Sequence, residues 1–125
     1  MFTIDTNILI AYVGGEEAVV DQMKAWREQA VMLFVSSIAE CELLSYPKIT
    51  TEEEVTIEHF LKEHFIAVPF DGGRARRAAI IRRTIPSLKL PDAAIAALAL
   101  EMNTPLVTRN IHDFKRIPGL EIITL

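Results

Sequence analysis

The sequence predicts a three-layer α/β/α domain built on a mostly parallel central sheet of four to five strands. Two observations lead to this prediction. Short apolar runs suited to buried strands alternate along the chain with longer segments whose apolar residues recur at helical spacing. No linker, low-complexity tract or repeat divides the 125 residues, so a single domain over residues 1–125 is expected. In such a sheet, ligands bind at the carboxyl ends of the strands.

The first third of the chain is expected to contain two strands with two helices between them. Met1–Ile4 is expected to form a strand, and Asn7–Val13 a helix that ends at a Gly-Gly pair. A second helix is expected over Glu16–Gln29, which places apolar residues on one face. The continuous apolar run VMLFVSS, residues 31–37, is typical of a strand buried on both faces.

Two capping-box spacings predict the helices of the middle third. Ser37 and Glu40 open a helix that ends near Tyr46, and Thr51 with Glu54 opens another helix of about four turns. The predicted capping role gives Glu40 a structural explanation.

The remainder of the chain, from residue 66, begins with one strand near the sheet edge and two long helices. Residues 66–70, IAVPF, form a strand placed near an edge because Pro69 lacks a backbone donor. The Arg-rich segment Gly73–Ile85 is expected to be helical, and Pro91 suits the first turn of the next helix, which runs to Met102. The remaining expected elements are a strand at residues 104–108, a short helical turn at 110–117 and a strand at 121–125.

Composition narrows the class of protein. The formal charge of −4 does not suit an overall basic nucleic-acid binder, and no apolar run is long enough to cross a bilayer. Asp5 interrupts the N-terminal apolar stretch, which has no basic residues before it, so no signal peptide is expected. The single cysteine, Cys41, suits a reducing cytoplasm and is interpreted as a small core residue.

Four carboxylates follow predicted strands: those of Asp5, Glu42, Asp92 and Asp113. Each has an ordinary alternative. Asp5 suits a helix N-cap, although Thr6 or Asn7 could take that role, and Glu42 suits a helix surface. Asp92 could complement a helix dipole, and Asp113 suits a turn. Their recurrence after strands of a parallel sheet is the stronger signal.

Clustered carboxylates repel one another, and their pKa values rise unless a cation neutralises them. No Lys or Arg adjoins Asp5 or Glu42 in the sequence, so a divalent metal is the simplest partner. Ligation by oxygen alone favours Mg²⁺ or Mn²⁺ over Zn²⁺. The three histidines have no zinc-ligand spacing and are interpreted as ordinary surface or core residues: His59, His64 and His112.

Four blocks of sequence, in this order, resemble PIN-domain ribonucleases, specifically the VapC-like toxins of toxin–antitoxin pairs: IDTNILIAY, SSIAECELL, LPDAAIAALAL and LVTRNIHDF. The resemblance implies that the four carboxylates are the catalytic residues and the ligands of Mg²⁺ or Mn²⁺. It also implies that Asn7, Thr108 and Asn110 support them by hydrogen bonding. Glu40 stands where an apolar residue is usual, so the choice of Glu42 depends on the ELL that includes it.

The resemblance implies a cytoplasmic, metal-dependent endoribonuclease that hydrolyses RNA phosphodiester bonds with metal-activated water. An antitoxin protein and a homodimer are the implied partners, and the apolar residues Val55, Phe60, Leu61 and Phe65 are a candidate groove wall. The residues expected to contact RNA, or alternatively an acidic antitoxin segment, are Arg74, Arg76, Arg77, Arg83, Lys89 and Arg109.

Two other classes of function stay open. A PIN fold could bind RNA or a protein without cutting, although the intact acidic set argues against this alternative. A receiver-like phosphotransfer domain also gathers acids at strand ends, but it would carry paired acids after the first strand, where this sequence has only Asp5.

Overall fold

The fold was analysed in a computed structural model that describes all 125 residues. Its sheet has five strands in the order β3-β2-β1-β4-β5, and every neighbouring pair is parallel. Receiver domains have the order 2-1-3-4-5, so the strand order excludes that alternative. The strands are β1 (Phe2–Ile4), β2 (Leu33–Ser36), β3 (Ile66–Val68), β4 (Leu106–Val107) and β5 (Ile122–Ile123).

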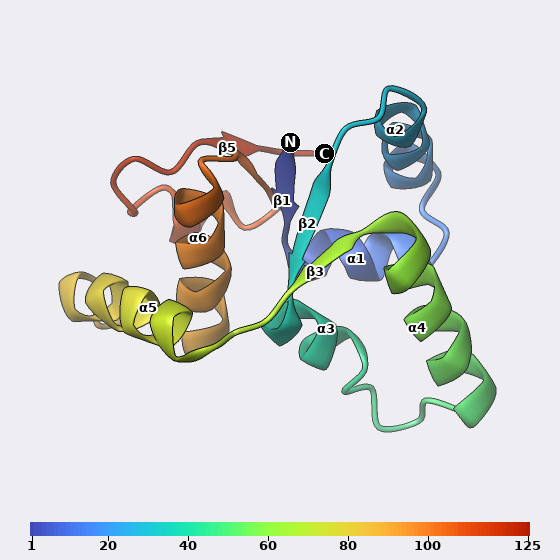
Figure 1. The fold of residues 1–125 in the computed structure, drawn as a ribbon, viewed down its shortest axis with the longest axis horizontal. Coiled ribbons are helices and arrows are strands. Elements are labelled where there is room, and N and C mark those ends of the chain that lie inside the picture. The colour runs from blue at the N-terminus through green and yellow to red at the C-terminus, as the bar shows by residue number, and fades with distance from the viewer.

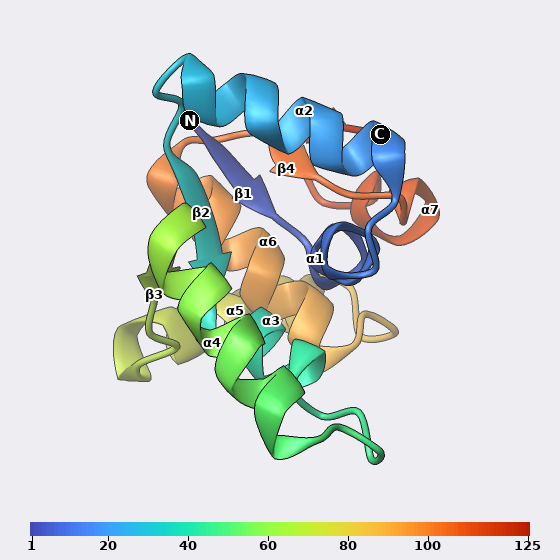
Figure 2. The same cartoon turned by 90° about the vertical axis from the view of Figure 1, so that its right-hand side faces the viewer.

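Seven helices cover the sheet: α1 (Thr6–Val13), α2 (Glu17–Glu28), α3 (Ser37–Leu43), α4 (Thr51–His64), α5 (Gly72–Thr84), α6 (Leu90–Met102) and α7 (Ile111–Phe114). Helices α5 and α6 lie on one side of the strands, and α1, α2 and α4 lie on the other (Figure 1). Figure 2 shows α1 end-on below the carboxyl end of β1. The predicted α/β/α layers and the edge position of β3 are therefore confirmed. No helix is both long and apolar enough to cross a bilayer.

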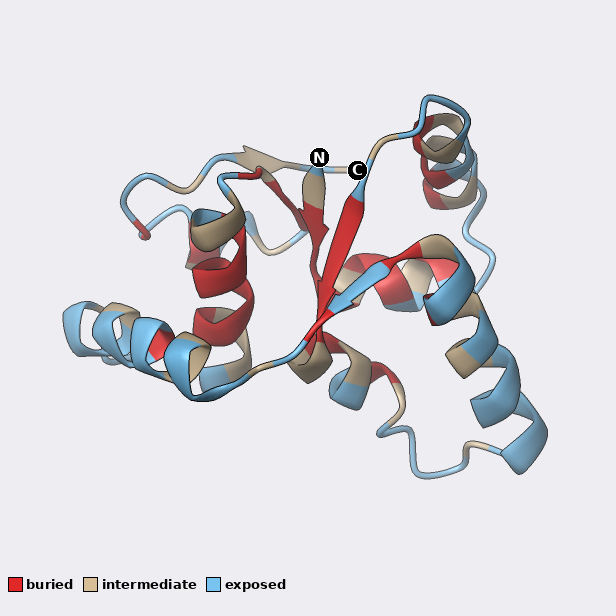
Figure 3. Cartoon of the chain, viewed as in Figure 1, coloured by how far each residue is buried: buried red, intermediate tan, exposed pale blue.

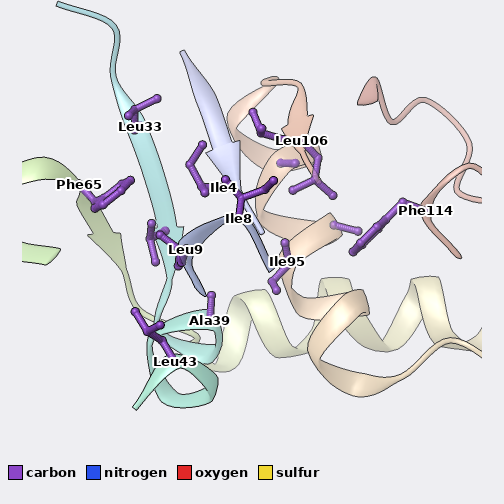
Figure 4. Close-up of a cluster of buried hydrophobic side chains, with 14 of the residues drawn as sticks. Ile4, Ile8, Leu9, Leu33, Ala39, Leu43, Phe65, Ile95, Leu106 and Phe114 are labelled. Carbon is purple, nitrogen blue, oxygen red and sulfur yellow. The ribbon is translucent and has the colours of Figure 1, made fainter. Parts of the chain in front are cut away.

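The core lies between the sheet and its two most buried helices, α1 and α6 (Figure 3). In α6 the seven consecutive residues Ala93–Ala99 are all buried. Most of them are alanines, which allow the helix backbone to approach the strands closely. Phe114 projects from α7 toward α6, where Ile95 lies in the same apolar cluster (Figure 4). The helices α4 and α5 expose most of their residues.

The N-caps of α3 and α4 were both predicted one residue too late, and only α4 has a capping box. Ser36 is the N-cap of α3 and accepts a hydrogen bond from the Ile38 N–H, whereas the Ser37 hydroxyl accepts from the Phe70 N–H. The box of α4 joins Thr50 and Glu53. In each case the N-cap residue has the extended backbone that a cap requires, and the predicted cap is already helical.

Candidate functional site

The candidate site lies where the strand order reverses, at the carboxyl ends of β1 and β4. Asp5 follows β1 directly, and Thr108 follows β4 directly. The Asp5 N–H donates to the Val107 carbonyl oxygen at 3.0 Å, which fixes the two strand ends side by side. Two residues 103 positions apart in the sequence can therefore share one site.

Asp5 is 4% exposed and both of its carboxylate oxygens accept hydrogen bonds. The Thr108 hydroxyl donates to Oδ2 and the Thr6 N–H donates to Oδ1, each at 2.7 Å. Burial raises the pKa of Asp5, and these two hydrogen bonds oppose that rise. Asp5 itself is the N-cap of α1, so the expectation that Thr6 or Asn7 takes the capping role is wrong. The same carboxylate caps the helix and faces the site.

Thr108 is the centre of a small hydrogen-bond network around Asp5. Its buried hydroxyl donates to Asp5 and accepts from the Asn110 N–H at 3.0 Å and from Asn7 Nδ2 at 3.4 Å. The Arg109 N–H donates to Asn7 Oδ1 at 3.3 Å. The structure thus brings together Asn7, Thr108 and Asn110, and it connects them to the carboxylate through the threonine hydroxyl.

Glu42 reaches the site from α3. Its carboxylate accepts a hydrogen bond from the Thr6 hydroxyl at 2.7 Å. The predicted capping role of Glu40 is not formed, because Ser36 rather than Ser37 caps the helix. The contact with Thr6, which adjoins Asp5, nevertheless favours Glu42 as the acid that belongs to the site. Cys41, predicted to be a core residue, is exposed instead.

Asp92 lies in the first turn of α6 and is partly buried. Burial is the largest cause that raises its pKa, and Asp5, Asp113 and Glu42 raise it further, to about 6. Lys89 acts in the opposite direction. Like charges shift a pKa only over short distances, so Asp5, Glu42 and Asp113 lie in the neighbourhood of Asp92.

Asp113 completes this group from α7. Its Oδ2 accepts from Asn110 Nδ2 at 2.9 Å, and its Oδ1 lies 3.4 Å from Arg116 Nη2. Two residues of the site were missed by the sequence analysis: Thr6 and Arg116. The position of Thr6 between Asp5 and Asn7 was a signal for the first, whereas nothing in the sequence pattern marks Arg116.

The oxygen donors of the four acids match the needs of a divalent cation. The donor set consists of oxygen atoms alone, carries an excess of negative charge and holds a carboxyl of raised pKa, which suits Mg²⁺ or Mn²⁺. In this structure no three His, Cys, Asp or Glu side chains are close enough together to hold an ion. Glu42 and Asp113 are instead held by Thr6 and Asn110. The chemistry of the residues fits such an ion, and their ligand role stays a prediction.

The predicted RNA-contacting arginines fall into two groups. Arg74 pairs with Asp71 and Glu101 at 3.2 and 2.9 Å, which ties α5 to α6. Arg109 pairs with Glu16 and donates from Nε to the Leu125 carbonyl oxygen. The residues that are exposed and form no ion pair are Arg76, Arg77, Arg83 and Lys89.

The predicted groove wall is mostly core. Leu61 and Phe65 are buried, Phe60 packs against the same cluster, and only Val55 is well exposed. The rings of Phe60 and Phe65 pack against Tyr12 of α1. An open groove of about 450 Å³ lies instead between α1, the segment after α3, and α4, and it extends to Glu42. Its apolar lining is Ile10, Val13, Leu43, Tyr46, Ile49 and Ile57.

The comparisons with known proteins agree with one another. The PIN domain family matches residues 2–120. Ribonuclease VapC of Rickettsia bellii is 31% identical over 136 aligned residues, and ribonuclease VapC1 of Rickettsia felis is 30% identical over 131. Each alignment covers 98% of this chain and 94% of the relative.

Solved structures of similar fold include two toxin–antitoxin complexes. A toxin–antitoxin complex from Klebsiella pneumoniae contains a chain with a TM-score of 0.81 and 31% identity, covering 99% of this chain and 97% of that one. VapBC2 from Rickettsia felis, bound to a DNA fragment from its promoter, has a TM-score of 0.82 at 21% identity, covering 99% and 98%. At that lower identity the similarity concerns the fold.

Proposed function

Because this chain belongs to the PIN domain family, we propose that it is a VapC-like ribonuclease, the toxin of a toxin–antitoxin pair, acting in the cytoplasm as one domain over residues 1–125. The observation that carries the proposal is the convergence of four carboxylates around Asp92 at the carboxyl edge of the sheet. The reaction is hydrolysis of RNA phosphodiester bonds.

The residues that would hold Mg²⁺ or Mn²⁺ are the four carboxylates, which come from the end of β1 and from α3, α6 and α7. When bound, such an ion activates water and stabilises the charge of the phosphoryl-transfer transition state. The chain's own polar residues orient the acids beforehand: Thr108 and the Thr6 N–H hold Asp5, the Thr6 hydroxyl holds Glu42, and Asn110 holds Asp113. Fixed oxygens need less reorganisation when the reaction proceeds.

An acidic site repels the phosphates of RNA, so cations must hold the backbone beside it. Lys89 lies three residues before Asp92, and its charge acts on that carboxyl. The exposed arginines of α5, namely Arg76, Arg77 and Arg83, have no carboxylate partner and extend this positive surface. Arg109 is less suited to RNA because Glu16 already binds its guanidinium.

Cleavage of a single-stranded RNA by the purified chain tests the proposal. We expect endonucleolytic products with Mg²⁺ or Mn²⁺, no products with excess EDTA, and recovery of activity when the metal is restored. Gel analysis of a labelled RNA measures all three states. RNA binding without cleavage in either metal would favour a non-cleaving PIN module instead.

The partner in this proposal is an antitoxin, and its place is the groove between α1 and α4. Exposed apolar side chains line it, with Ile10 55% and Tyr46 57% exposed, and Glu42 and Glu53 add negative charge. An antitoxin segment with apolar residues and a basic side chain would match both features, and it would cover the path to Glu42. The proposal also includes a homodimer, as in VapC-like toxins generally.

Replacing Tyr46 by Asp is expected to weaken antitoxin binding by about 30-fold, because a charge would then lie among apolar side chains at the centre of the contact. Isothermal titration with the cognate antitoxin measures the affinity. Met32→Asp is the matched control, because Met32 is 45% exposed and lies before β2, outside this groove. If both variants bind the antitoxin with equal affinity, the antitoxin binds at another surface of the chain.

A further inference from the structure

Arg116 lies beside the acidic site, and neither the ligand set nor the expected RNA contacts include it. It follows α7, and three contacts hold its guanidinium. Nη1 donates to the Ser87 hydroxyl at 2.7 Å, Nε donates to the Asp113 carbonyl oxygen at 3.4 Å, and Nη2 lies 3.4 Å from Asp113 Oδ1. The planar fork of a guanidinium suits such a bridge, which a lysine cannot reproduce.

The bridge joins the connection that precedes α6, the helix of Asp92, to the segment that carries Asp113. Ser87 lies in the connection from α5 to α6, which leads through Lys89 to Asp92. Asp113 is held on its other oxygen by Asn110. With Arg116 on Oδ1 and Asn110 on Oδ2, both oxygens of the carboxylate have a defined partner. The connection before Asp92 and the short helix that carries Asp113 are thereby fastened to each other.

We propose that Arg116 is a positioning residue of this site: by bridging Ser87 and Asp113, it holds the Asp113 carboxylate in place beside Asp92 for a divalent cation. The inference rests on the proposed function and names a residue through which that site is built. Arg116 is 35% exposed in its side chain and Asp113 is 33% exposed, so the ion pair adds little to folding stability. Its loss can therefore be studied in a folded chain.

The direction in which loss of Arg116 changes the metal affinity shows whether Arg116 positions Asp113 or acts only through its charge. Removing a cation near four carboxylates would strengthen metal binding if charge alone mattered. Removing a residue that orients a ligand weakens it, and partners of this kind contribute about 10-fold or more to metal affinity or activity. The two explanations of the Arg116 contacts thus predict opposite results.

The experiment compares Arg116→Gln with wild type by titration of the full chain with Mn²⁺ alone, followed by RNA cleavage kinetics. We expect the Mn²⁺ dissociation constant to rise about 10-fold and kcat to fall by a similar factor, with KM for RNA changed by less than about twofold. Ser87→Ala should also raise the Mn²⁺ dissociation constant and lower kcat, but by smaller factors. Arg116→Lys should not restore wild-type affinity, because a single ammonium cannot span both partners.

Lys115→Gln is the matched control, because it removes the same charge one residue away from a side chain without an ion pair. It should leave Mn²⁺ affinity and kcat close to wild type. Unchanged or tighter Mn²⁺ binding by Arg116→Gln, or a change confined to KM, would overturn the proposal, and the last result would indicate direct phosphate contact. A wild-type chain that binds Mn²⁺ but does not cut RNA would contradict the proposed function alone.

Discussion

Replacing Asp92 by Asn is expected to lower kcat/KM for RNA cleavage by about 100- to 1,000-fold, which corresponds to roughly 3–4 kcal/mol of lost transition-state stabilisation. Burial and the other three acids raise the pKa of Asp92, so a cation bound there would relieve the repulsion among these carboxylates. Asparagine has nearly the same shape and retains one oxygen, but it lacks the negative charge. Initial rates on a labelled single-stranded RNA over a range of substrate concentrations measure the change.

The same substitution should leave the fold intact and slightly more stable at neutral pH in the absence of metal. The pKa of Asp92 is about 6 in the folded chain, above the ordinary value of 3.8. A group with a raised folded-state pKa contributes stability that is fully present below pH 3.8 and is lost as pH rises through about 6. Asparagine does not titrate, so the Asp92→Asn chain does not lose this stability as the pH rises. Its unfolding temperature should therefore change less between pH 4 and pH 7 than that of the wild type.

Asp21→Asn provides the matched control, because Asp21 lies on the exposed face of α2 and forms no ion pair. It should cut RNA at the wild-type rate. If the Asp92→Asn chain is fully active, Asp92 is not a catalytic residue. A chain that is inactive and also less stable at pH 7 would mean that the ionised carboxyl is structural.

The positions of the four acids could be predicted because parallel strands bring their carboxyl ends to one edge of a sheet. The alternation of strands and helices is enough to predict that Asp5, after β1, and Asp113, after β4, lie at the same edge of the sheet. Asp92 was predicted by its place in the first turn of an apolar helix. These inferences depend on secondary structure, which local patterns encode well.

The hydrogen bonds that orient the acids depend on tertiary distances, and no local pattern contains them. Thr6 contacts Glu42 across 36 residues, and Arg116 contacts Ser87 across 29. Arg109 was assigned to RNA because it is basic and near the site, but Glu16, which is 93 residues away, already binds it. Cys41 was assigned to the core because cysteine is usually buried, whereas its position on α3 faces solvent.

Replacing Phe114 by Ala is expected to lower the free energy of unfolding by about 3–5 kcal/mol, because it removes a buried aromatic side chain and leaves a cavity. Phe114 is fully buried and packs in the cluster that includes Ile95 of α6 and Leu106 of β4. Domains of this size have a total stability of about 5–15 kcal/mol, so the loss is a large share of it. Urea unfolding followed by circular dichroism measures the difference.

This packing also determines where Asp113 lies, because α7 has only four residues and its N-cap makes no side-chain hydrogen bond. Phe114 therefore anchors the backbone of α7 in the core, while Asn110 and Arg116 hold the side chain of Asp113. Ile111→Ala on the same helix is the control: Ile111 is 44% exposed, and its loss should cost about 0.5 kcal/mol or less. If Phe114→Ala does not fold, Phe114→Leu should still lower both stability and kcat by smaller amounts. Wild-type kcat in a measurably destabilised Phe114 variant would show that Asp113 is held independently of the core.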